Sequence, residues 1–93
     1  MSEKVRVCVI LKGRVQGVFF RQETLKKARE IGVFGFVRNL AGGEVEALFE
    51  GEKEKAKEIL SWIKEGPRFA KVKDCQITWQ EYKGEFNSFE IKY

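Results

Sequence analysis

Apolar and polar residues alternate along several short stretches of this chain. In the first stretch every second residue is apolar; these residues are Val5, Val7, Val9 and Leu11. A period of two predicts a β-strand with one buried face. Segments 33–39 and 44–50 are also rich in apolar residues, and the turn sequence Ala41-Gly42-Gly43 separates them, which predicts a β-hairpin. We expect its second strand to bury one set of side chains and expose the other; the buried set is Val45, Ala47 and Phe49, and the exposed set is Glu46, Leu48 and Glu50.

Two other segments repeat apolar residues every three or four positions, which predicts amphipathic helices. The first helix is expected at about residues 22–31, before Gly32. The second ends before Gly66-Pro67, and its predicted buried face consists of Ala56, Ile59, Leu60 and Ile63. Further strands are expected at 72–82 and 89–93, with a turn near 83–85.

The predicted order is strand, helix, strand, strand, helix, strand, followed by a short extra C-terminal strand. This order is typical of an α+β fold of the ferredoxin-like kind, the βαββαβ or split βαβ sandwich. In this fold two helices cover one face of an antiparallel sheet, the first and third strands pair in its middle, and the second strand flanks the third. The 93 residues contain no evident linker or repeat, so we expect a single domain over residues 1–93.

The composition restricts the chemistry that the chain can perform. Histidine is absent, which excludes Ser-His and Cys-His nucleophilic pairs and removes the commonest metal ligand. The net charge of +4 suits an anionic ligand or a nucleic acid, but the 18 basic residues are spread among 14 acidic ones. No apolar stretch approaches the roughly 20 residues of a membrane span, and no signal-like segment follows Met1. We therefore expect a cytoplasmic protein in which Cys8 and Cys75 are reduced.

A basic segment with two glycines, GRVQGVFFRQE from Gly13 to Glu23, joins the first predicted strand to the first predicted helix. A loop in this place presents free backbone N–H groups and the positive end of a helix dipole, which together favour anions. Gly13 and Gly17 would allow the N–H groups to converge, and Phe19 and Phe20 could pin the loop to the core. Two glycines and an arginine also suit an ordinary turn with a solvated charge, so the loop alone leaves both interpretations open.

Asn39 is a second candidate, at the end of the first hairpin strand. Asparagine is a common turn residue, and that interpretation suffices for Asn39 by itself. The predicted sheet, however, allows the end of this strand to lie near the glycine-containing loop. An uncharged amide there could hold a water molecule by hydrogen bonds.

The two segments together resemble a known family. Gly13 to Arg21 resembles the signature loop of the acylphosphatase family, and Gly35 to Asn39 followed by Gly43 resembles its second signature. Further similar features run through the chain: Val45-Glu46-Ala47, Glu50-Gly51, Gly66-Pro67 and the closing Phe89-x-Ile91-x-Tyr93. The resemblance implies an enzyme that hydrolyses the carboxyl–phosphate bond of acyl phosphates to a carboxylate and inorganic phosphate.

The resemblance also implies roles for individual residues. Arg21 would bind the phosphoryl group together with the loop amides, and Asn39 would position the attacking water. The loop amides are those of Val15, Gln16, Gly17, Val18, Phe19 and Phe20. The resemblance implies neither a metal nor a cofactor. The expected partner is a small-molecule acyl phosphate, and we expect no binding to nucleic acid or to a membrane. The protein is expected to be a monomer. Phe19 stands where the family commonly has a smaller residue, so its ring could narrow the pocket.

The sequence leaves two other functions open. The tetrapeptide Phe34-Gly35-Phe36-Val37 matches the middle of an RNA-binding motif that occurs on sheets of this topology. That motif belongs on the third strand, however, and here it falls on the second. A non-catalytic regulatory domain that keeps the fold and an anion site is the other alternative.

Overall fold

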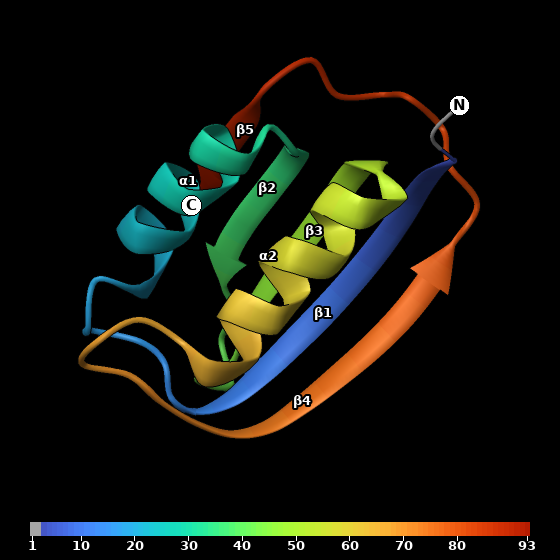
Figure 1. The fold of residues 1–93 in the computed structure, drawn as a ribbon. Helices are drawn as coiled ribbons and strands as arrows, with labels where there is room; N and C mark the ends of the chain where they lie inside the picture. The colour runs from blue at the N-terminus through green and yellow to red at the C-terminus, as the bar shows by residue number, and fades with distance from the viewer. Residues whose placement is uncertain (1–2) are drawn as a thin grey trace.

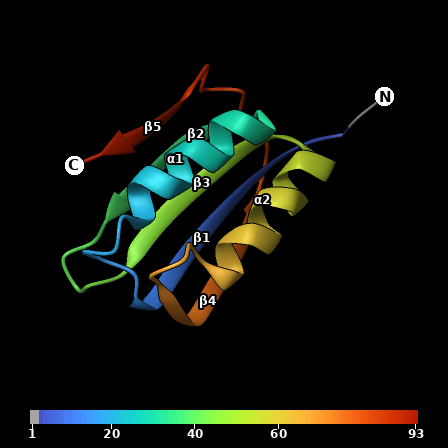
Figure 2. The ribbon, with the colours of Figure 1, turned by 60° about the vertical axis from the view of Figure 1, so that its left-hand side comes forward.

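The computed structural model describes residues 3–93 and has the predicted order of elements. These elements are β1 (Lys4–Arg14), α1 (Phe20–Ile31), β2 (Phe34–Asn39), β3 (Val45–Glu52), α2 (Lys53–Glu65), β4 (Lys71–Gln80) and β5 (Phe89–Lys92). The strands form one sheet in the order β4-β1-β3-β2-β5, with β1 and β3 paired near its middle as predicted. Both helices pack on the same face of this sheet (Figures 1 and 2).

The four strands of the βαββαβ plan pair antiparallel, as predicted, and the extra C-terminal strand makes the sheet mixed. β5 runs parallel to β2, from Gly35 opposite Phe89 to Arg38 opposite Lys92, whereas the other pairs are antiparallel. β4 and β5 lie at opposite edges of the sheet, and residues 81–88 connect them along one end of the molecule (Figure 1). Because this connection stays at the end where β4 finishes, β5 must run back in the direction opposite to β4, which is the direction of β2.

The core lies between the sheet and the helices. The predicted inward residues of β1 and β3 are fully buried, apart from Val5, which is half-buried. All four predicted residues of α2 are buried as well, and the aromatic rings of Phe49 and Phe89 stack with their centroids 5.4 Å apart. The periodic pattern therefore identified the core correctly.

The opposite face of β3 is covered, contrary to expectation. Leu48 and Glu50 are only 4% and 2% exposed. Glu50 accepts hydrogen bonds from three consecutive backbone N–H groups of the 81–88 connection, those of Lys83, Gly84 and Glu85, at 2.9, 3.2 and 3.1 Å. Its carboxylate also forms an ion pair with Arg6 at 3.1 Å. Burial by itself would raise the pKa of Glu50, but these donors stabilise the ionised form and hold the pKa below its ordinary value.

Candidate active site

The segment that joins β1 to α1 is shorter than predicted. β1 continues to Arg14, and α1 begins at Phe20 rather than near residue 22, so the loop proper is Val15–Phe19. Gly13 lies within β1 at an irregularity in the pairing with β4, and a Cβ on it would collide with the carbonyl oxygen of Lys71. Gly13 therefore permits the close approach of two strands and does not belong to the curl of the loop.

Two left-handed residues shape the loop. Gly17 has φ 72° and Phe19 has φ 61°, and Phe19 is the single residue other than glycine with a positive φ in the described chain. Among the hydrogen bonds of residues 3–93, none has the backbone N–H of Gln16, Gly17, Val18 or Phe19 as its donor. The first N–H groups of α1 have no partner within the helix either. Successive free amides in such a turn form a concavity that favours an anion.

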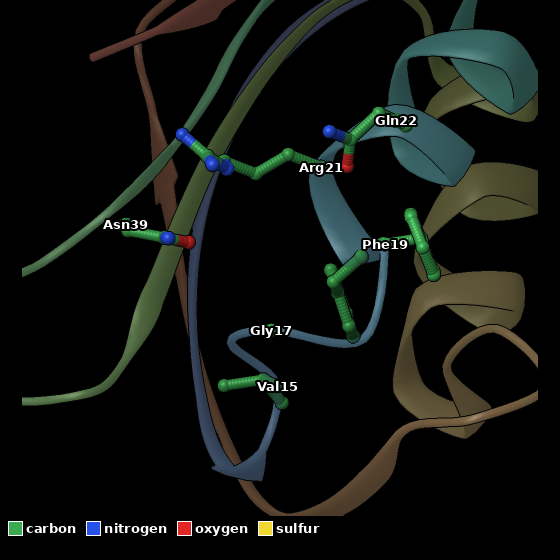
Figure 3. Close-up of a pocket in the computed structure, with 7 residues that line it drawn as sticks. Val15, Gly17, Phe19, Arg21, Gln22 and Asn39 are labelled. Atoms are coloured by element: carbon green, nitrogen blue, oxygen red, sulfur yellow. The ribbon is translucent and has the colours of Figure 1, made fainter.

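Three apolar side chains hold the loop against the core. Val15, Val18 and Phe20 are 0%, 5% and 2% exposed. Phe20 thus pins the loop as predicted, but Phe19 does not, because its side chain is 66% exposed. The ring of Phe19 lies on the side of the loop away from Asn39 and toward α2, so it borders the pocket and leaves the space between Arg21 and Asn39 open (Figure 3).

Gln16 connects the loop to the β2–β3 hairpin. Its side-chain Nε2 donates to the carbonyl oxygens of Leu40 and Glu44, at 2.8 and 2.9 Å. Leu40 directly follows Asn39, so these bonds fix the position of Asn39 relative to the loop amides. Sequence reasoning assigned only the backbone amide of Gln16 and missed this side-chain role, since the two carbonyl partners are 24 and 28 residues away in the chain.

Arg21 and Asn39 project into one pocket of about 180 Å³ from the start of α1 and the end of β2 (Figure 3). Among residues 3–93, no carboxylate lies within ion-pair distance of the Arg21 guanidinium. The ring of Tyr93 lies 5.0 Å from it, in a cation–π contact. The guanidinium is therefore oriented by an aromatic ring, and its charge is available to an external anion.

Most of the residues proposed from the sequence come together in this pocket. Those that line it are Val15, Gly17, Phe19, Phe20, Arg21 and Asn39. Gln16 and Val18 do not line it: the first binds the hairpin and the second is buried. Gln22, which was not proposed, also lines the pocket, and its place in the first turn of α1 was the available signal.

The pocket offers electrostatic stabilisation without acid or base groups. None of its lining residues is an acid, a lysine, a cysteine or a tyrosine. Within the part of the chain that the structure describes, no cluster of cysteine and carboxylate side chains could hold a metal ion. What the site presents is a set of free amides, the guanidinium of Arg21 and the carboxamides of Gln22 and Asn39, a combination suited to a phosphoryl group and a water molecule.

Comparisons with known proteins show which family this chain resembles. The sequence matches the acylphosphatase family model over residues 7–91. The acylphosphatase of Pelotomaculum thermopropionicum is 42% identical over 90 residues, which cover 97% of this chain and 98% of that protein. That of Pyrobaculum calidifontis is 47% identical over 90 residues, covering 96% of this chain and 82% of that protein. The crystal structure of acylphosphatase from Bacillus subtilis matches with a TM-score of 0.91 at 32% identity, over 96% of this chain and 99% of that chain.

The chain belongs to the acylphosphatase family, as the two sequence motifs indicated. The ferredoxin-like α+β fold is confirmed by the same structural match. The comparisons do not favour the RNA-binding or the non-catalytic alternative. No helix in residues 3–93 combines the length and apolar character needed to cross a bilayer.

Proposed function

We propose that the protein hydrolyses acyl phosphates at the pocket formed by the 15–20 loop, Arg21 and Asn39. One observation carries this proposal: the loop amides are free, and they adjoin a guanidinium that has no carboxylate partner in the described chain. The phosphoryl group binds the amides of residues 15–20 and the fork of Arg21, which matches two phosphate oxygens. The reaction yields a carboxylate and inorganic phosphate.

Asn39 positions the attacking water. Its carboxamide can both donate and accept hydrogen bonds without changing its charge, so it can orient a water toward phosphorus over a wide pH range. In a loose phosphoryl-transfer transition state the attacking and leaving oxygens are nearly in line, and positioning together with electrostatic stabilisation supplies most of the rate enhancement. The leaving carboxylate is stable as an anion, so the reaction needs no general acid.

The proton of the water passes to an oxygen of the substrate's own phosphoryl group. The absence of any general base among the residues that line the pocket supports this step. It requires that no enzymic group titrates between the acid and alkaline limits of the reaction. A pH–rate profile that is flat near neutrality, after correction for ionisation of the substrate, is the expected result.

We propose that residues 1–93 act as a single acylphosphatase-like domain that works as a monomer in the cytoplasm, without metal or cofactor. The 15–19 loop, α1 and β2 belong to the same chain, so one copy carries all of the proposed site residues.

Hydrolysis of acetyl phosphate in the presence of EDTA tests the function directly. We expect turnover that EDTA does not reduce and that inorganic phosphate inhibits competitively. Glycerol 3-phosphate is the matched control, because its alkoxide leaving group needs a proton that this pocket cannot supply. Equal hydrolysis of both compounds, or hydrolysis of neither, would contradict the proposal.

A further inference from the structure

A second cleft lies directly beside the proposed phosphate pocket. Its volume is about 370 Å³, and it is formed between the start of α1, the end of α2 and the segment that follows α2. Phe19 lines both cavities and forms the wall between them. The loop and the segment after α2 lie at the same end of the molecule in both ribbon views (Figures 1 and 2).

We infer that this cleft binds the acyl group of the substrate and favours apolar, aromatic acyl groups. The inference rests on the proposed function, because it takes the position of the phosphoryl group as given. It names the substrate class that the same site selects, which the comparisons leave open.

In-line geometry places the acyl group on the side of the phosphorus that faces the cleft. Asn39 holds the water on one side of phosphorus, so the leaving oxygen must point away from Asn39. Phe19 lies on that opposite side of the loop, and its ring is directed toward α2 (Figure 3). An acyl group attached to the leaving oxygen would therefore pass Phe19 and enter the cleft.

The lining of the cleft fits an aromatic ring. Phe19, Trp62, Pro67 and Phe69 supply apolar surface, and the two phenylalanine side chains are 66% and 60% exposed. Exposed aromatic side chains beside a polar pocket are typical of a small-molecule site and can pack on a ligand ring. Their exposure also gives the site apolar surface that it can remove from water when substrate binds.

Charge in the cleft is balanced. Arg68 lies 5.6 Å from the ring of Phe69 in a cation–π contact, and Glu23 lines the same cleft. A second negative charge on the acyl group would meet Glu23 as well as Arg68. The cleft thus selects by apolar surface and shape, and an uncharged ring is the best occupant.

Substitution of Phe69 tests binding of the acyl group independently of binding of the phosphoryl group. Phe69 lines the cleft and does not line the phosphate pocket, and the acetyl group has no ring to pack on it, so Phe69→Ala should affect acetyl phosphate less than benzoyl phosphate. It should lower kcat/KM for benzoyl phosphate about fivefold, through KM, because a contact with the substrate ring is lost. Benzoate and acetate are leaving groups of similar basicity, so the difference reports binding and not chemistry.

Phe34→Ala is the matched control, since Phe34 is also an exposed phenylalanine but lies at the far end of β2 from Asn39. Its benzoyl-to-acetyl ratio should equal that of the parent. Inhibition by inorganic phosphate should be the same in all three proteins, which establishes that the phosphate pocket is intact. As a second measurement, benzylphosphonate should shift the indole N–H resonance of Trp62 in the parent, and methylphosphonate should not.

The outcomes are distinguishable. Loss of selectivity for the benzoyl group in Phe69→Ala alone supports the inference. If Phe69→Ala has the parent's ratio of kcat/KM for benzoyl phosphate to kcat/KM for acetyl phosphate, or loses activity equally on both substrates, the inference is wrong. In that case hydrolysis of acetyl phosphate by the parent still supports the proposed function. A parent protein that hydrolyses neither substrate overturns both.

Discussion

Replacement of Arg21 by lysine removes the planar fork while keeping the positive charge. The guanidinium can donate two parallel hydrogen bonds to phosphate oxygens, and an ammonium group acts as a point charge in their place. A charge-assisted hydrogen bond contributes about 1.5–3 kcal/mol. Loss of one such bond, together with the contact to Tyr93, should lower kcat/KM by about 10²-fold, which corresponds to ~2.7 kcal/mol of transition-state stabilisation.

Stability should change little in this variant. Arg21 is partly exposed in the first turn of α1, and none of the ion pairs within residues 3–93 includes it. Substitutions at such positions usually alter the free energy of unfolding by about 0.5 kcal/mol or less. A loss of activity can therefore be attributed to the site once thermal unfolding has been compared.

Arg14→Lys is the matched control. Arg14 is an exposed arginine at the end of β1, seven residues earlier in the chain, and it does not line the pocket. The assay is steady-state hydrolysis of acetyl phosphate by both variants, with the inhibition constant of inorganic phosphate measured alongside. We expect a large loss and weaker phosphate inhibition in Arg21→Lys and parent-like values in Arg14→Lys. Equal activity of the two variants would refute the role assigned to Arg21.

Three further substitutions test other parts of the structure. Asn39→Ala should lower kcat about 10²-fold while the inhibition constant of phosphate stays within about twofold of the parent's, because it removes the water-positioning group and leaves the anion site; a matching loss of phosphate binding would contradict this. Phe19→Gly should be more stable to urea than Phe19→Ala by about 1 kcal/mol, the reverse of the usual order, because φ at this residue is 61°; the usual order would show that the loop does not adopt this turn. Glu50→Gln should lower the free energy of unfolding at pH 7 by about 3 kcal/mol, since it breaks a buried ion pair. Folding lowers the pKa of Glu50, so the ionised carboxylate stabilises the folded state above its unfolded pKa of about 4.3, and this stabilisation is lost as the pH falls further. If the difference in free energy of unfolding between parent and variant stays constant from pH 7 to pH 2, this role of Glu50 is excluded.

The local pattern predicted the elements that bury one regular face. Val7, Val9 and Leu11 in β1 and Ile59 and Ile63 in α2 followed the periods of a strand and a helix, and all are fully buried. These predictions succeed because a sheet or helix face must be apolar wherever it packs on a core. The alternation of residues in β3 also placed Glu50 correctly on the face opposite Val45, Ala47 and Phe49.

Features that depend on distant parts of the chain were not predictable from the pattern. Glu50 is buried because residues 83–85 cover its face, and β5 is parallel because the same connection leads the chain to the far edge of the sheet. Nothing in a period of two indicates either outcome.

The candidate site was predicted where it depended on motifs. Arg21 and Asn39, which lie in two separate motifs, line one pocket. The side-chain bonds of Gln16 and the left-handed conformation of Phe19 were missed, because each is imposed by packing of the loop against the hairpin and the core. Phe19 is the residue where local propensity and tertiary structure conflict, and it lines the candidate site.

Titration of ¹⁵N-labelled protein with inorganic phosphate tests the central claim most directly, because it observes the proposed N–H donors one by one. The account predicts that the largest shifts occur at the backbone amides of residues 15–20 and at Nε of Arg21, all with the same dissociation constant. Shifts confined to other basic surfaces, with these amides unmoved at saturating phosphate, would contradict it.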